Sequence, residues 1–201
     1  RAAADIESLF QVQLDGSFDV FVAGTLYAAP DRHLRGRSLS VYRQSFFLHD
    51  GSGDAVDQQY ISTHELTHLF AWNIYGQPYS TMVSEGAAVY SGTNAIQGMG
   101  NLPLETFCAA YLQEGSLPRV SGALSFSGHI YDLQNYFSAG CFVKYLVEAY
   151  TPQSFGLVYD SGDWAGVYGK SLAALEDDWR IALEGVPLPA GFDSLRLVNS
   201  V

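Results

Sequence analysis

The segment His64-Glu65-Leu66-Thr67-His68 constrains this chain more than any other feature, because it places two histidines four residues apart. In a helix, residues at this spacing lie on one face, roughly 6 Å from each other. The pattern from about Val56 to Tyr75 predicts such a helix, and Gly76-Gln77-Pro78 is suited to end it. Both imidazoles can therefore reach one tetrahedral metal ion at about 2.0–2.1 Å.

A histidine pair on a helix can also be an ordinary surface pair, so a metal site needs a third ligand. A second helix is predicted from Ser80, a suitable cap, to Gly92. In an antiparallel hairpin, the first helix continues about 10 Å beyond His68, and the second rises about 8 Å from Ser80 to Glu85. Glu85 should then lie nearly level with His68. The set His64, His68 and Glu85, with an open fourth position, is typical of catalytic zinc.

Glu65 is the predicted general base, since a carboxylate beside the first histidine can take a proton from water that zinc has acidified. The oxyanion of a tetrahedral intermediate also needs a donor, usually a tyrosine or histidine. His129, Tyr131 and Tyr136 lie close together in the sequence and are the candidates. Any one of thirteen tyrosines is, however, more often a packing residue. His33 and His49 are interpreted as solvated loop residues, and His129 can be one too.

The histidine motif, followed by Ser84-Glu85-Gly86-Ala87-Ala88-Val89-Tyr90, resembles the gluzincin metallopeptidases, whose second helix carries a Glu-Gly-x-Ala signature. Tyr136–Tyr150 and Tyr168–Arg180 are similar to the third and closing helices of the peptidase MA-like group. The resemblance covers about Asp54 to Leu183. It implies a zincin-like fold, zinc as the cofactor and a peptide or protein as the substrate, and it favours Tyr136 as the oxyanion donor.

The chain departs from this family pattern in three places. The gap between His68 and Glu85 is shorter than in the better-studied gluzincins, which implies a tighter hairpin. Val89 stands where many gluzincins have an acidic residue that supports a ligand histidine, so that partner is unidentified. Thr151 replaces the glycine that usually follows the tyrosine ending the third helix. None of these departures removes a metal ligand.

The predicted fold class is α+β, with a small N-terminal sheet followed by a helical C-terminal half. Residues 1–201 fit one domain, and a sheet-rich lobe over 1–55 with a helical lobe over 56–201 is compatible with it. Ser38–Leu48 can border the cleft and pair with an extended substrate, or be an ordinary covered strand. The remaining predicted elements are a helix Ala2–Leu14, a strand Phe18–Leu26, a loop His49–Asp57, and helices Leu104–Gln113, Asn135–Tyr150, Gln153–Tyr159 and Ser171–Leu183.

Composition narrows the possible partners. The chain is 48% apolar with a net charge of −11, and its ten lysines and arginines are scattered. These values predict a globular protein that binds neither nucleic acid nor an anionic membrane surface. No apolar run is long enough for membrane insertion. Low lysine content favours a secreted or extracytoplasmic protein, and the opening Arg-Ala-Ala-Ala-Asp is typical of a piece of a longer precursor. The oligomeric state is left open.

The sequence leaves open the state of the two cysteines and the choice between several functions. Cys108 and Cys141 can form one disulfide or remain two buried thiols. The main functional hypothesis is a zinc-dependent peptidase. The alternatives are a non-catalytic module that binds a protein or glycan, and a hydrolase of some other amide or ester. An intact Glu65 favours an enzyme, since a binding module has no use for a base beside the metal.

Overall fold

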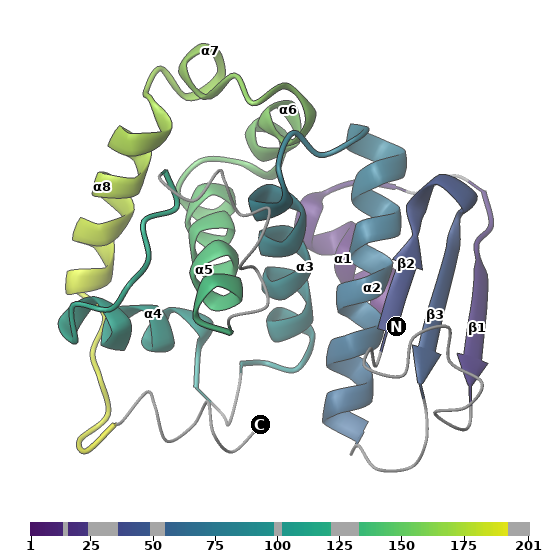
Figure 1. The fold of residues 1–201 in the computed structure, drawn as a ribbon, viewed down its shortest axis with the longest axis horizontal. Helices are drawn as coiled ribbons and strands as arrows, with labels where there is room; N and C mark the ends of the chain where they lie inside the picture. Colours follow the sequence, from purple (N-terminus) through teal and green to yellow (C-terminus); the bar gives the residue numbers. More distant parts are fainter. Residues whose placement is uncertain (14–15, 24–35, 49–54, 99–101, 122–132, 193–201) are drawn as a thin grey trace.

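The computed structural model describes residues 1–13, 16–23, 36–48, 55–98, 102–121 and 133–192. These residues form a mixed α+β fold that is mostly helical, as the sequence predicts (Figure 1). The elements, in chain order, are α1 (Ala2–Phe10), β1 (Asp19–Ala23), β2 (Gly36–Leu39), the 3-10 turn η2 (Ser40–Tyr42), β3 (Gln44–Leu48), α2 (Ala55–Tyr75), α3 (Thr81–Ala95), α4 (Leu104–Gln113), α5 (Leu133–Ala149), α6 (Pro152–Ser161), α7 (Trp164–Tyr168) and α8 (Leu172–Glu184).

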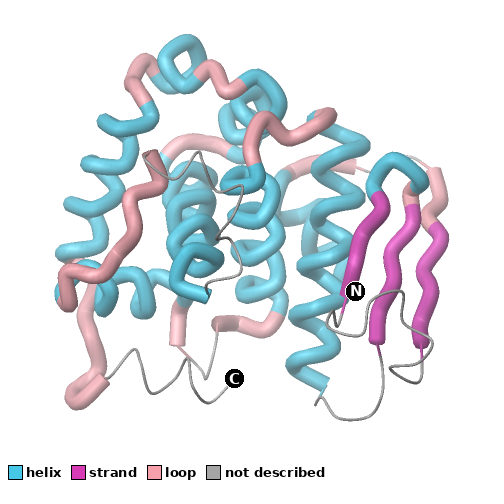
Figure 2. Tube along the Cα trace, viewed as in Figure 1, coloured by secondary structure: helices cyan, strands magenta, loops and turns pink. Residues whose placement is uncertain are grey.

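The sheet and the helices lie on opposite sides of α2. Strands β1, β3 and β2 stand together on one side, while α3, α5 and α8 follow one another on the other (Figures 1 and 2). Strands β2 and β3 both contact α2, with β2 the nearer of the two, and α3 packs against both α2 and α5. Within the described ranges, no helix is both long and apolar enough to cross a membrane.

The sheet differs from the prediction at Ser38–Leu48, which is not one strand but a hairpin. Strand β2 runs antiparallel to β3, and β3 runs parallel to β1 on its other side. The turn contains Arg43 in the left-handed region, with φ 53°, and its N–H donates to the carbonyl of Ser40 at 3.1 Å. No Gly, Pro, Asn or Asp occurs at this turn, so the usual sequence signal for a hairpin is missing. Strand β2 therefore forms an edge of the sheet, beside α2.

Most predicted helices are confirmed, with ends that shift by a few residues. Helix α1 stops at Phe10 because Gln11 adopts a left-handed conformation. Helix α3 continues past Gly92, where a Cβ would lie 2.8 Å from the ring of Tyr60. The five-residue helix α7 is missed, because it is too short to show helical periodicity. Ser80 occupies the predicted cap position, although its hydroxyl makes no capping bond.

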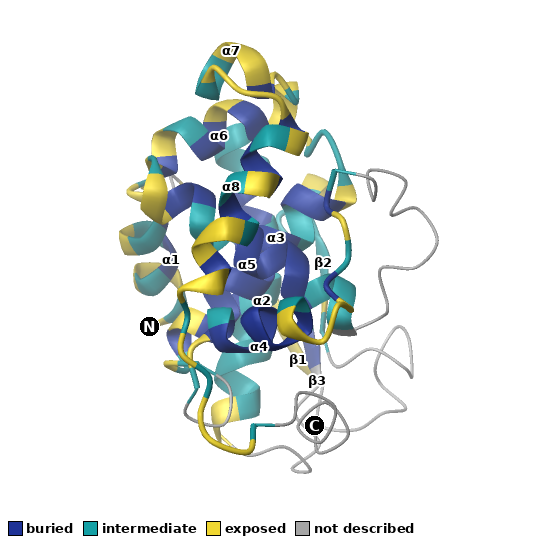
Figure 3. Ribbon diagram, turned by 90° about the vertical axis from the view of Figure 1, so that its left-hand side faces the viewer, coloured by how far each residue is buried: buried dark blue, intermediate teal, exposed yellow. Residues whose placement is uncertain are grey.

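Helix α3 is buried on nearly every side, between α2 and α5 (Figure 3). Its small residues permit a close crossing with α5. A Cβ at Gly86 would lie 2.7 Å from the carbonyl oxygen of Ala139, and one at Gly140 would lie 2.4 Å from the Val89 side chain. The backbones of the two helices therefore touch one residue away from Glu85, and this contact sets where that carboxylate stands.

The tryptophan–arginine pair near the end of the chain closes the helical half. Trp179 is buried, and its ring lies 5.4 Å from that of Phe142 on α5. Arg180 donates to the carbonyls of Leu117 and Pro118, each at 2.9 Å, and forms a 3.1 Å ion pair with the fully buried Glu176. Helix α8 thus anchors the segment that follows α4.

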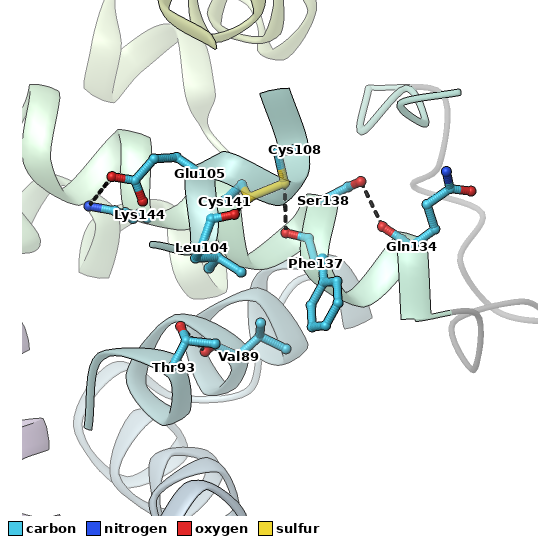
Figure 4. Close-up of a disulfide and its surroundings, with 10 residues drawn as sticks. All are labelled: Val89, Thr93, Leu104, Glu105, Cys108, Gln134, Phe137, Ser138, Cys141 and Lys144. Carbon is cyan, nitrogen blue, oxygen red and sulfur yellow. Dashed lines mark hydrogen bonds and ion pairs between the residues drawn. A yellow bond between two sulfur atoms is a disulfide. The ribbon is translucent and has the colours of Figure 1, made fainter. Parts of the chain in front are cut away.

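Cys108 of α4 and Cys141 of α5 are joined by a disulfide, which decides between the two alternatives that the sequence leaves open (Figure 4). Their Cα atoms are 6.7 Å apart, and both residues are buried. A crosslink that closes a loop of this size typically stabilises a protein by about 2–4 kcal/mol. It fixes α5, whose first turns carry Tyr136, against α4.

Gly86→Ala tests whether the crossing of α3 and α5 is as close as described. Because the new Cβ would meet the backbone oxygen of Ala139, which cannot rotate away, α5 must shift. We expect a loss of about 1–3 kcal/mol in the free energy of unfolding, measured by urea denaturation. Gly185→Ala is the matched control, since its Cβ would only touch the carbonyl of Ala182 at 3.5 Å. Equal stability of the two variants would contradict the close crossing.

Candidate metal centre

Helices α2 and α3 bring three side chains together, as the hairpin argument predicts. His64 and His68 lie one turn apart on α2, and their Nε2 atoms are 3.3 Å from each other. Glu85 of α3 places Oε2 3.3 Å from Nε2 of His64 and 3.5 Å from Nε2 of His68. The three residues are partly buried and form a group that could hold a metal ion.

The spacing of these atoms can be compared with that of known metal ligands. In a tetrahedral site with bonds of about 2.0–2.1 Å, neighbouring ligand atoms are about 3.3–3.4 Å apart. The three observed separations of 3.3, 3.3 and 3.5 Å fall at or beside these values. Three ligands leave one tetrahedral position open. The distances between the three donor atoms therefore match those of a single tetrahedral ion.

The charges of the group also suit a cation. Burial raises the pKa of Glu85, but its hydrogen bonds to His64 and His68 lower it by more, so the net pKa lies well below the usual range. Burial lowers the pKa of His68, and the hydrogen bond and charge of Glu85 more than offset this, so its pKa is raised. Glu85 therefore offers a carboxylate at neutral pH, while a proton on His68 competes with a metal for the same nitrogen.

One of the two histidines has a clear supporting partner among the described residues, and the other does not. Nδ1 of His68 lies 3.1 Å from the hydroxyl of Ser84, which in turn bonds to Tyr159 of α6. With its proton on Nδ1, His68 would turn the Nε2 lone pair toward the metal position. Nδ1 of His64 is buried and finds no hydrogen-bond partner among the described residues.

Glu65 is held from the other side by strand β2. The hydroxyl of Ser38 lies 2.9 Å from Oε2 of Glu65 and 2.6 Å from its backbone carbonyl, and it donates its single proton between them. Ser45 of β3, fully buried, lies 3.2 Å from the Ser38 hydroxyl and can donate to it. A Cβ on Gly36 would sit 2.6 Å from Cγ of Glu65. The edge strand thus packs directly onto the predicted base.

These groups share one pocket of about 390 Å³. Its walls come from β2, α2, the turn after α2, α3, α5 and α6. Tyr136 of α5 contributes to them, with its ring centroid 6.4 Å from that of His64. The lining residues are Gly36, Arg37, Ser38, Ser40, His64, Glu65, His68, Trp72, Pro78, Thr81, Ser84, Glu85, Tyr136 and Tyr159.

Several predicted residues cannot be placed, and several placed residues were not predicted. His129 and Tyr131, like His33 and His49, lie outside the described residues. Reasoning from the sequence missed the five residues Ser38, Tyr60, Trp72, Ser84 and Tyr159, all in or beside the pocket. Two of them lie on α2 at helical spacing from the motif histidines, and this spacing could have indicated them. Tyr60 lies one turn before His64, and Trp72 lies one turn after His68. No local pattern marks Ser38 or Tyr159.

Two of the tyrosines are neutral hydroxyl donors in this environment. Burial raises the pKa of Tyr60, and the nearby charge of Glu85 raises it further. Burial also raises the pKa of Tyr159, with a smaller opposing effect from its hydrogen bond to Ser84. Neither phenol ionises near neutral pH, so each can donate a hydrogen bond but does not act as a base.

Comparisons with known proteins assign no family to this chain. No protein-family model matches the chain, and neither curated proteins nor solved structures give a match. The arrangement of the side chains is therefore what indicates a function for this chain.

Ser84→Ala tests whether Ser84 orients His68. Removal of the hydroxyl leaves Nδ1 of His68 without this partner, and we expect zinc affinity to fall about 10–100-fold, measured by competition with a chelator. Ser91→Ala is the matched control, because Ser91 lies on the same helix and its hydroxyl donates to the carbonyl of Ala87, away from His68. An equal loss of affinity in both variants would assign the effect to the helix and not to His68.

Proposed function

We propose that this protein is a zinc-dependent hydrolase that cleaves peptide bonds, with Glu65 as the general base. The observation that carries the proposal is the convergence of His64, His68 and Glu85 at tetrahedral spacing, with a carboxylate that is not a ligand beside them. A set of two histidines and one carboxylate with an open position is typical of catalytic zinc, whereas structural zinc usually has four protein ligands. We further propose that the fold is zincin-like.

The metal and the base have separate tasks. Zinc, when bound, polarises a carbonyl oxygen and lowers the pKa of water. Glu65 accepts the proton from the attacking water at a carboxylate oxygen and later delivers it to the leaving amine. Ser38 and Gly36 restrict the rotamer of Glu65, because one bonds to its carboxylate and the other packs on its Cγ. This restraint keeps the base in place for both transfers.

Strand β2 is suited to align the substrate. It pairs with β3 on one side only, and no described strand pairs with its other edge. Its residues Gly36 and Ser38, with Ser40 just after it, border the pocket. An extended peptide that adds to this edge would run past the metal ligands, as peptides add to exposed sheet edges in other recognition sites.

Tyr136 is our proposed oxyanion donor, because it is the one residue predicted for this role that lies among the described residues. It reaches the pocket from α5, opposite β2 and next to His64. A phenol hydroxyl can donate to the oxygen that becomes negative when water attacks the carbonyl. The hydroxyls of Tyr60 and Tyr159 lie near the charge of Glu85 and would be the next candidates for the oxyanion donor.

The disulfide supports a location outside the cytoplasm. Disulfides form and persist in oxidising compartments and are rare in the cytosol. The bond between Cys108 and Cys141 is therefore consistent with the secreted or extracytoplasmic protein that the composition suggests. The substrate would accordingly be a peptide or protein of that compartment.

The main alternative is a module that keeps the same fold only to bind a protein or glycan. The close contacts that position Glu65 count against it, since binding alone would not require them. Hydrolysis of another amide or of an ester would use the same residues, and substrate profiling with and without a chelator separates it from peptide cleavage.

Glu65→Gln is the direct test of the proposed enzyme. Glutamine keeps the shape of the side chain and can still accept the hydrogen bond of Ser38, but it cannot take a proton near neutral pH. We expect peptide turnover to fall about 10²–10⁴-fold, with zinc content and thermal unfolding unchanged. Glu184→Gln, on the exposed face of α8, is the matched control and should keep full activity. Turnover that survives in Glu65→Gln would contradict the assignment of the base.

Tyr136→Phe tests the oxyanion donor. Loss of the hydroxyl should lower kcat about 10²–10³-fold with little change in KM or zinc content, because the bond forms only in the transition state. Tyr145→Phe is a suitable control, since Tyr145 lies on the same helix but does not line the pocket. A normal kcat in Tyr136→Phe would transfer the role to another hydroxyl.

A further inference from the structure

The pocket extends one helical turn beyond the metal ligands, toward the closed end of the hairpin. Trp72 lies four residues after His68 on α2, and Thr81 lies four residues before Glu85 on α3. Pro78 stands in the link between the two helices, and all three residues line the pocket. Residues four apart share a helix face, so this part of the pocket adjoins the metal position directly.

Trp72 differs from the other two tryptophans of the chain. Trp164 and Trp179 are buried in the core, with 7% and 1% of their surface exposed. Trp72 is partly exposed and lies outside the core formed by the described residues. An indole ring is a large apolar surface, and one that borders a cavity instead of the core is available to a ligand. Its place beside the ligands makes this surface relevant to substrate binding.

The charges of the lining residues are unevenly distributed. Apart from the three metal ligands and Glu65, Arg37 on β2 is the single charged residue among those that line the pocket. Trp72, Pro78 and Thr81, which line the same pocket, carry no ionisable group. An aromatic ring, a pyrrolidine ring and a threonine methyl group favour an uncharged side chain, because a charged one would lose hydration without gaining a partner.

We propose that Trp72, Pro78 and Thr81 form a subsite for a bulky apolar side chain, preferably aromatic, of the peptide substrate. The inference rests on the proposed function, since it places this side chain next to the bond to be cleaved. The whole pocket, at about 390 Å³, is large enough for a phenyl ring beside the peptide backbone. Stacking or edge contact with the indole of Trp72 would provide the preference for an aromatic ring.

Amino acid hydroxamates test the subsite without any need to know the substrate. The hydroxamate group chelates the metal, so the attached side chain samples the adjacent wall. We expect the phenylalanine hydroxamate to bind zinc-loaded protein about 10-fold or more tightly than the alanine hydroxamate, measured by calorimetry. A lysine hydroxamate that binds most tightly would overturn the proposal in favour of a site for cations on the Trp72 ring.

Variants assign the preference to Trp72. Trp72→Ala should reduce the ratio between the affinities for the phenylalanine and alanine hydroxamates to within about threefold, while Trp72→Phe should keep most of this ratio. Tyr42→Ala is the matched control, because Tyr42 is 70% exposed and does not line the pocket. Zinc content and circular dichroism establish that each variant is folded. An unchanged ratio in Trp72→Ala would refute the subsite while leaving the proposed hydrolase intact.

Fluorescence gives an independent readout. Trp72 is the least buried of the three tryptophans, so an aromatic hydroxamate that contacts it should shift the protein emission. The same addition to Trp72→Phe should produce no shift. If no hydroxamate of the series binds, including that of alanine, the metal-dependent function itself is contradicted, and with it the subsite that depends on it.

Discussion

The direct contact between α3 and α5 is the constraint on which the remaining geometry depends. Gly86 and Gly140 allow the two helix backbones to touch, so that α3 is enclosed between α5 and α2. Glu85 precedes Gly86 and is thereby held level with the two histidines of α2. The same contact directs the first turns of α5, and hence Tyr136, into the pocket beside His64. Small residues in α3 are therefore a condition for the metal ligands to meet.

The second constraint comes from the sheet, which limits the freedom of the predicted base. Strand β2 lies on α2 at the point where Glu65 emerges, with no room for a side chain at Gly36. Ser38 links the Glu65 carboxylate to Ser45, which is buried in the next strand. The helices thus position the three candidate ligands, and the sheet positions the predicted base.

The three candidate metal ligands could be predicted from the sequence because each depends on local rules. Helical spacing places His64 and His68 on one face, and the rise of two helices from a short turn brings Glu85 level with them. Ser38 and Tyr159 could not be predicted, since they reach the pocket from elements far away in the sequence. The β2–β3 hairpin was missed because its turn uses Arg43 in a left-handed conformation without a glycine. Local patterns therefore predict the ligands but not their supports.

Metal content decides whether His64, His68 and Glu85 form a zinc site. Elemental analysis of protein purified without added chelator, combined with X-ray absorption at the zinc edge, should give one zinc per chain with two nitrogen ligands and one carboxylate oxygen from the protein. Glu85→Ala should lose stoichiometric zinc, because two histidines alone leave the ion without its anionic ligand. Full zinc occupancy and affinity in Glu85→Ala, or wild-type protein that binds no zinc at all, would contradict the account.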